Sequence, residues 1–226
     1  MPDFITKHDI FMILGSVAVL VCCYLTGEII RRLFGLTGSF SRKFIHIAIA
    51  IWACAVYFIF EHKEMAVVLP VLFCTANISP IRSRIFRISG IEDTFHPGML
   101  YYPISLFFLL WFCWDEQSRW AGIVSLLNLG LGDSAAWIIG SRYGKLQYRV
   151  GESKKSYAGT AAMMVICIIC VTAVILITSS PLDMRDIVAI LAISAGATLL
   201  EAVCSNGLDN ICVPLGSALI YSFFYQ

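Results

Sequence analysis

Ionisable side chains are rare within the long apolar segments of this chain, so the few that occur are candidates for chemistry. They are Glu28, His46, Asp133 and Glu201, with Asp209 just beyond an apolar segment. An ionisable group inside a bilayer is costly, and each therefore calls for a functional explanation. Carboxylates can bind Mg²⁺ or accept the proton of a substrate hydroxyl group.

Asp133 is the strongest of these candidates. It stands in the segment Asn128-Leu-Gly-Leu-Gly-Asp133-Ser-Ala-Ala, where small residues surround the acid. Small residues let helices pack closely, which accounts for the glycines and alanines but leaves the carboxylate unexplained. We therefore predict that Asp133 is a catalytic base or a metal ligand.

A basic segment rich in glycine and hydroxyl side chains follows Asp133. Its members are Gly140, Arg142, Gly144, Lys145, Lys154, Lys155, Ser156, Gly159 and Thr160. Lysine side chains and backbone amides at a helix start favour anions, so this segment is a candidate phosphate site. Basic residues also gather beside membrane spans for reasons of topology alone, and the spacing is not that of a Walker A loop.

A third cluster joins Glu201 to Asn206, Asp209 and Asn210. Two carboxylates and two amides suit Mg²⁺, which retains waters and binds phosphate oxygens. Helix capping is an alternative role for the last three residues. It does not account for Glu201, which lies about two turns further into its helix.

Two smaller clusters stand at the start of apolar runs. Arg42, Lys43 and His46 open one run, and His96-Pro97-Gly98 precedes another that begins with Tyr101-Tyr102-Pro103. Basic flanks and interfacial tyrosines are ordinary at membrane surfaces, so both clusters also have a purely structural explanation.

The elements that must position these residues are membrane helices. Of the 226 residues, 59% are hydrophobic and 14% are charged, whereas a soluble domain is about 25% charged. The net charge of +1 provides no field that would attract nucleic acid, so we expect no nucleic-acid partner. The length suits a single integral membrane domain, 1–226.

Eight apolar runs approach the length that crosses a bilayer. They lie near 9–30, 44–60, 65–79, 99–114, 119–140, 158–178, 186–206 and 211–224. The third and the last are short and contain Pro70 and Pro214, so either can be broken or tilted. We predict an all-α, polytopic transmembrane helical bundle of about 7–8 spans.

Loop charge predicts the orientation of these spans. Alternate hydrophilic segments contain 12 of the 16 lysine and arginine residues, so we expect those segments in the cytoplasm and both termini outside. The ionisable residues of the spans then lie toward cytoplasmic helix ends, which predicts a polar cavity open to the cytosol. Because the first apolar run is too long for a cleavable signal, and no transit segment is evident, we expect a microbial plasma membrane protein.

Five short motifs occur in one order along the chain. They are Arg42-Lys43-x-x-His46, Tyr102-Pro103, Gly132-Asp133-x-x-Ala136 with Gly140 and Gly144, Lys155-Ser156-x-x-Gly159, and Glu201 with Asp209-Asn210-x-x-x-Pro214. This order resembles the phytol kinase and dolichol kinase family of membrane lipid kinases over about residues 28–220. Yeast-type CTP-dependent diacylglycerol kinase and the bacterial phosphatidate cytidylyltransferases are relatives in the wider group.

The resemblance implies a CTP-dependent, Mg²⁺-dependent kinase that phosphorylates a membrane lipid alcohol at the cytoplasmic face. Asp133, Glu201 and Asp209 would bind Mg²⁺ and activate the lipid hydroxyl, and Lys155 would be a further catalytic residue. The nucleotide would be bound by Arg42, Lys43, His46, Arg142, Lys145, Lys154, Lys155, Ser156, Gly159, Thr160, Asn206 and Asn210. The partners would be a nucleoside triphosphate, a lipid alcohol and membrane lipids.

Several alternatives stay open at this point. The lipid can be phytol, farnesol, a longer polyprenol or diacylglycerol, and a CTP:phospholipid cytidylyltransferase of the phosphatidate type would use the same groups. A proton-coupled transporter also buries acids, but nearer the bilayer midplane and within an inverted repeat, which is not evident here. Small residues on several spans can serve contacts within or between chains, so a homo-oligomer is open as well.

Overall fold

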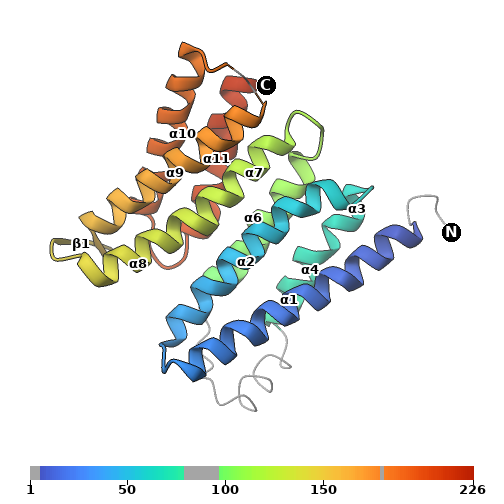
Figure 1. Cartoon of the computed structure of the whole chain (residues 1–226), viewed down its shortest axis with the longest axis horizontal. Coiled ribbons are helices and arrows are strands. Elements are labelled where there is room, and N and C mark those ends of the chain that lie inside the picture. The colour runs from blue at the N-terminus through green and yellow to red at the C-terminus, as the bar shows by residue number, and fades with distance from the viewer. Residues whose placement is uncertain (1–5, 79–96, 179–180) are drawn as a thin grey trace.

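The computed structural model describes residues 6–78, 97–178 and 181–226 as a bundle of helices with one small hairpin (Figure 1). The helices are α1 (Lys7–Leu33), α2 (Gly38–Ile59), α3 (Lys63–Ala66), α4 (Val68–Ile78), α6 (Gly98–Phe112), α7 (Arg119–Leu127), α8 (Ser134–Tyr143), α9 (Tyr157–Thr178), α10 (Met184–Val203) and α11 (Asp209–Tyr225). A π-helical segment, η1 (Asn128–Asp133), joins α7 to α8, and the strands β1 (Gln147–Val150) and β2 (Ser153–Ser156) follow α8.

The all-α membrane architecture is confirmed. By length and composition, five helical stretches of the described chain can cross a membrane: Lys7–Leu33, Gly38–Ile59, Arg119–Tyr143, Tyr157–Thr178 and Met184–Val203. The apolar helix α6 is shorter, at 15 residues. Helix α4 lies within the third predicted run and has 11 residues, and α11, which contains the last predicted run, has 17. Their shortness agrees with the prediction, and the number of full crossings remains a prediction.

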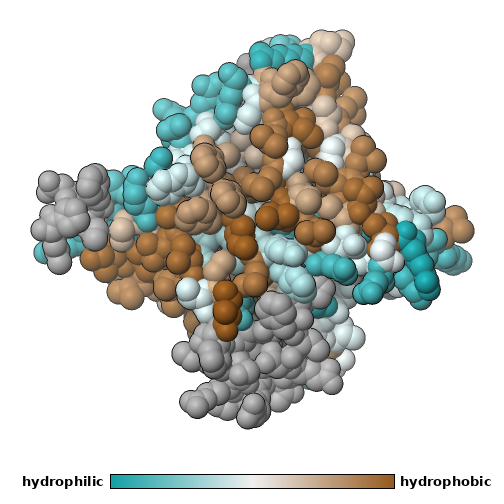
Figure 2. Space-filling view, turned by 180° about the vertical axis from the view of Figure 1, so that it is seen from behind, coloured by the Kyte–Doolittle hydropathy of each residue, from teal (hydrophilic) through white to brown (hydrophobic). Residues whose placement is uncertain are grey.

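Apolar side chains cover the outside of this bundle as well as its interior. Leu109, Leu126 and Ile193 are almost fully buried between helices, whereas Phe11 and Leu14 of the marginal helix α1 are exposed. Figure 2 shows apolar residues over the middle of one face and polar residues mainly toward its margins. This distribution is expected of a protein whose outer surface contacts lipid, since lipid tails are as apolar as a protein core.

The two ends of the bundle carry different segments. One end holds the α1–α2 connection, the β1–β2 hairpin and the α10–α11 connection (Figure 1). The other holds the start of α1, the α2–α3 connection, the α6–α7 connection and the C-terminus. Of the four segments predicted to be cytoplasmic, the three that the structure describes are therefore gathered at the first end. Arg82, Arg84, Arg87 and His96 lie outside the described residues.

The hairpin and the π-helical segment were not predicted from sequence. Strands β1 and β2 pair antiparallel, with Tyr148 opposite Lys155 and Arg149 opposite Lys154. Gly151, in the turn between them, has a φ of 56°, which glycine adopts without the steric cost of a side chain. Segment η1 ends at Asp133, and π-helical turns within α-helices often mark functional sites.

Candidate active site

A polar cleft of about 380 Å³ opens at the hairpin end of the bundle. Nine of the residues predicted to bind nucleotide, bind metal or take part in catalysis line it: Lys43, Asp133, Lys154, Lys155, Ser156, Gly159, Thr160, Glu201 and Asp209. They come from α2, η1, the hairpin, α9, α10 and α11. Segments that are far apart in the sequence thus supply one site, and a polar cavity was predicted from the ionisable residues at these helix ends.

Asp133 forms an ion pair with Lys43 across the cleft. The pair is possible because α2 crosses η1 at very short range: a Cβ atom added at Gly130 would overlap that of Ala50. The Asp133 side chain is 8% exposed and that of Lys43 is 20% exposed. A buried carboxylate needs a compensating charge, and Lys43 supplies it while its ammonium group reaches the cleft.

Glu201 forms the second ion pair of the cleft. Nζ of Lys155 lies 2.6 Å from Oε1 of Glu201 and also donates a hydrogen bond to the backbone carbonyl of Glu201. Because Lys155 stands on β2 and Glu201 near the end of α10, this pair ties the hairpin to the bundle. Both side chains are largely buried, at 12% and 9% exposure.

The hairpin is also attached to the start of α9. The hydroxyl of Ser156 accepts a hydrogen bond of 3.1 Å from the amide of Gly159, and the hydroxyls of Tyr148 and Thr160 lie 2.7 Å apart. A Cβ atom at Gly159 would lie 2.7 Å from the carbonyl oxygen of Ala136, so glycine is required where α8 and α9 cross. The same close packing explains Gly140 and Gly144, both of which contact Ser156.

Asp209 begins α11 and faces the cleft after a tight loop. Asn206 and Gly207 of that loop have φ values of 55° and 82°. Asparagine tolerates this left-handed conformation better than most residues, which gives Asn206 a conformational role. The side-chain amide of Asn210 donates to the carbonyl of Gly98 at 3.4 Å, and so joins α11 to α6. Neither asparagine lines the cleft.

Five other predicted residues lie outside the cleft lining. The ring of His46 contacts that of Tyr102 at 4.3 Å in an edge-on arrangement, and its Nε2 atom is buried without a hydrogen-bond partner. Arg42 is exposed and donates to the hydroxyl of Ser39 at 3.1 Å. Arg142 is also exposed and stacks over Tyr143, and Lys145 is exposed as well. Glu28 is bound by Arg31 and Arg32 of its own helix.

The cleft also contains residues that sequence reasoning missed, notably Trp137, Ser141 and Gln147. Trp137 and Ser141 stand four and eight positions after Asp133, a spacing that places all three on one face of a helix. That spacing was the available signal. Gln147 begins the hairpin and had no comparable signal, because the hairpin itself was not foreseen.

The three carboxylates of the cleft do not meet at one point. Across the described ranges, one group of three His, Cys, Asp or Glu ligand atoms lies within 4.8 Å of one another, and it is at the opposite end of the bundle. Asp133 and Glu201 are paired with lysines, and no described residue forms an ion pair with Asp209. The set fits Mg²⁺ held by one or two carboxylates together with phosphate oxygens, which is how this ion is commonly bound.

The fold and the cleft define a polytopic helical membrane protein whose polar groups converge at one end. The chain is 26% identical to a phytol kinase from Synechocystis sp. over 198 residues, which cover 87% of this chain and 84% of the relative. It is 29% identical to probable phytol kinase 2, chloroplastic, from Glycine max, and 27% identical to a probable chloroplastic phytol kinase from Triticum aestivum. The alignments cover 66% of each of these two plant relatives and 84% and 80% of this chain.

These matches show that the chain is related to the phytol kinases over most of its length, as the order of its motifs predicted. No family model matches the sequence, and no solved structure matches it.

Proposed function

We propose that this protein is a membrane kinase that transfers the γ-phosphoryl group of CTP to the hydroxyl of a prenol or a related lipid alcohol. The observation that carries the proposal is the cleft, in which two buried lysine–carboxylate pairs and Asp209 converge at one end of a lipid-facing bundle. The relation to phytol kinases supports the same reaction class.

The lysines would bind the triphosphate. Lys43, Lys154 and Lys155 approach the cleft from two sides, and phosphate oxygens are strong ligands for ammonium groups. When the phosphates draw Lys43 away from Asp133, the carboxylate loses its charge partner and becomes a better proton acceptor. Nucleotide binding would therefore activate the base.

The transfer itself is an in-line displacement. The lipid oxygen forms a bond to the γ-phosphorus while the bond between that phosphorus and the β,γ-bridging oxygen breaks, and the nucleoside diphosphate leaves. The hydroxyl proton passes to Asp133. Mg²⁺, when bound, supplies charge neutralisation on the phosphate oxygens, and Asp209 with Glu201 would hold it. The lysines supply the remaining positive charge.

The position of the cleft at the helix ends suits a lipid alcohol. A prenol can keep its chain among the apolar helices while its hydroxyl reaches the polar layer at the membrane surface. By the distribution of lysine and arginine, this end faces the cytoplasm, or the compartment that corresponds to it in the source organism.

A direct assay tests the proposal. Purified protein in detergent would be given Mg²⁺, CTP labelled at the γ-phosphate, and phytol, farnesol, a longer polyprenol or diacylglycerol. We expect label in the lipid fraction of a prenol and release of CDP. The alternative cytidylyltransferase would release pyrophosphate with phosphatidate or a prenyl phosphate and leave no γ-label in lipid. Transfer from ATP but not from CTP would contradict the assigned donor.

A further inference from the structure

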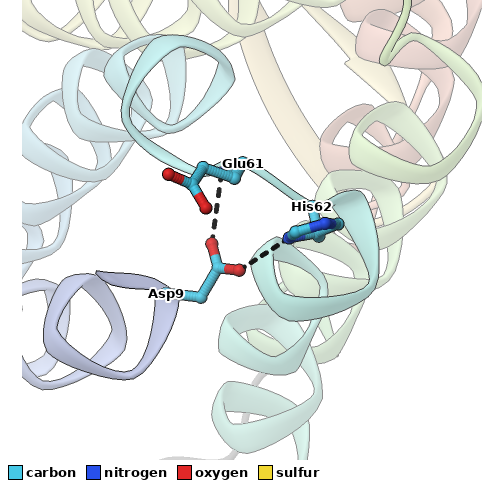
Figure 3. Close-up of side chains that lie close together, drawn as sticks. All are labelled: Asp9, Glu61 and His62. Atoms are coloured by element: carbon cyan, nitrogen blue, oxygen red, sulfur yellow. Dashed lines mark hydrogen bonds and ion pairs between the residues drawn. The ribbon is translucent and has the colours of Figure 1, made fainter. Parts of the chain in front are cut away.

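Three side chains of types that bind metal ions, Asp9, Glu61 and His62, meet at the end of the bundle opposite the cleft, and His8 lies beside Glu61. His8 and Asp9 belong to the first turn of α1, and Glu61 and His62 form the connection between α2 and α3. Oδ2 of Asp9 lies 2.8 Å from Nδ1 of His62, and Oε1 of Glu61 lies 3.8 Å from Nδ1 of His8. Figure 3 shows three of these residues, Asp9, Glu61 and His62, whose ligand atoms all lie within 4.8 Å of one another.

Local structure holds the carboxylate of Asp9 in place. Thr6 caps α1 by accepting a hydrogen bond from the amide of Asp9, and its hydroxyl donates to Oδ2 of the same residue at 3.1 Å. The backbone amide of Glu61 donates to Oδ1 at 3.1 Å. Two segments that are about fifty residues apart are thereby fixed against each other, with their ligand-type side chains on the same side.

The charge of this group suits a bound cation. With neutral imidazoles, the two carboxylates give it a formal charge of −2. The Asp9 side chain is fully buried, and within the described ranges the one ion pair it forms is with His62, while no lysine or arginine contacts it. Thr6, His62 and the backbone amide of Glu61 hydrogen-bond the buried carboxylate, and a divalent ion would neutralise the remaining charge of the group without burying a further side chain.

The donor set identifies the kind of ion. Two imidazole nitrogens and two carboxylates suit Zn²⁺, which prefers four ligands in tetrahedral geometry. Zinc–ligand bonds of about 2.0–2.2 Å place the ligand atoms about 3.3 Å apart, which falls within the 2.8 to 4.8 Å separations among Asp9, Glu61 and His62. The half-exposed His8, 3.8 Å from Glu61, would supply the fourth ligand by a change of rotamer. The side chains of His62 and Glu61 are 32% and 52% exposed, so an ion can enter from water.

We propose that His8, Asp9, Glu61 and His62 form a binding site for Zn²⁺ or a similar divalent transition ion, which fastens the start of α1 to the α2–α3 connection. The site is separate from the Mg²⁺ position suggested for the cleft and does not depend on the proposed kinase activity. Without an ion, the same contacts would amount to a histidine–carboxylate pair, and metal binding distinguishes the two.

Metal uptake and thermal stability test this proposal without an activity assay. Chelator-treated protein in detergent would be titrated with Zn²⁺, and the unfolding midpoint followed. At a concentration about one hundred times Kd, we expect the midpoint to rise by about 5 °C or more, because the ion binds the folded state. The variant H62A should lose this rise. E116Q, which removes an exposed carboxylate at the same end, should keep it.

Two further measurements separate this site from zinc bound elsewhere on the chain. The chain has nine free cysteines that can bind Zn²⁺, so Co²⁺ would be used as a spectroscopic probe that distinguishes the ligands. The wild type should show visible Co²⁺ bands without thiolate charge transfer, and H62A should lose these bands. Because H62A also removes a contact of the buried Asp9, H8A serves as a milder variant and should weaken binding by about tenfold or more. Equal uptake and an equal shift in wild type, H62A and H8A, or no Zn²⁺-dependent shift in the wild type, would overturn the proposal.

Discussion

Lys43 and Lys155 each form an ion pair with a carboxylate that the proposed reaction uses. Both pairs are largely buried, so neither lysine can leave its partner without another anion to take its place. The phosphates of a nucleotide are such an anion. The ion pairs therefore belong to the cleft without nucleotide. In the proposed reaction, Asp133 can act as a base only after nucleotide binding has released Lys43.

Substitution of Asp133 by asparagine tests this role. D133N keeps the size of the side chain and removes its capacity to accept a proton, so we expect turnover to fall by about 10²–10⁴-fold. Nucleotide affinity should be nearly unchanged, because Lys43 remains free to bind phosphate. The measurements are kcat with the best lipid alcohol and the nucleotide Kd, with D115N at the opposite end as the control. Retention of more than about a third of wild-type turnover would remove Asp133 from the mechanism.

The pair of Lys155 and Glu201 predicts non-additive stability. K155M leaves the carboxylate of Glu201 buried and unpaired, which should cost about 3–5 kcal/mol of folding free energy. Adding E201Q removes the unpaired charge and should restore most of that loss without restoring activity. Unfolding midpoints of both single variants and the double variant measure the coupling, and K154M, at an exposed neighbour, is the control. Simple additivity would mean that the two side chains do not interact.

Residue types within apolar runs made much of the cleft predictable. Asp133 and Glu201 stand out in such runs because a charge there is expensive, and the cleft is where the structure places both. Tryptophan, serine and glutamine carry no such penalty, so Trp137 and Ser141 could be found only by their helical spacing from Asp133, and Gln147 had no signal. His46 is a different case: its type and motif suggested a ligand for nucleotide, and its ring packs against Tyr102 outside the cleft lining.

At the scale of elements, a single close crossing sets the geometry of the cleft. Helix α2 approaches η1 so closely that Gly130 has no room for a side chain beside Ala50. This approach carries Lys43, about two turns earlier on α2, to Asp133. The apolar run over 119–140 predicted one span and could not foresee a π-helical segment, because apolar composition does not distinguish π-helical from α-helical turns. The hairpin was missed because its strands have four residues each, mostly polar or charged.

The crossing predicts a compensating pair of substitutions. G130A adds a methyl group that overlaps Ala50, which should push α2 away and cost about 1–3 kcal/mol. Activity should fall with it, because Lys43 moves relative to Asp133. Removing the opposing methyl group in A50G/G130A should recover part of both losses. Unfolding midpoints and turnover of the two single variants and the double variant measure the recovery. If neither stability nor turnover recovers, the contact between Gly130 and Ala50 does not set the position of α2.

At the scale of the whole molecule, the two ends of the bundle differ in the chemistry they hold. The lysine-rich cleft lies at one end, and the cluster of His8, Asp9, Glu61 and His62 lies at the other. The start of α1, the α6–α7 connection and the C-terminus share that second end. Because the two ends of the described chain lie on the same side of the bundle, the arrangement agrees with an even number of membrane crossings. With the five longer stretches, the shorter helices α4, α6 and α11 would then complete eight passes, each spanning less than a typical bilayer.

This arrangement predicts the membrane orientation. The hairpin end carries most of the lysine and arginine, so it should face the cytoplasm, and both termini should be outside. An epitope inserted after Gln117, in the α6–α7 connection, should be accessible to antibody in intact cells, whereas one inserted after Gly151, in the hairpin turn, should be accessible only after permeabilisation. Alkaline phosphatase fused after Gln226 should be active for the same reason. The opposite pattern would place the cleft outside the cytoplasm and away from CTP, and would count against the kinase itself.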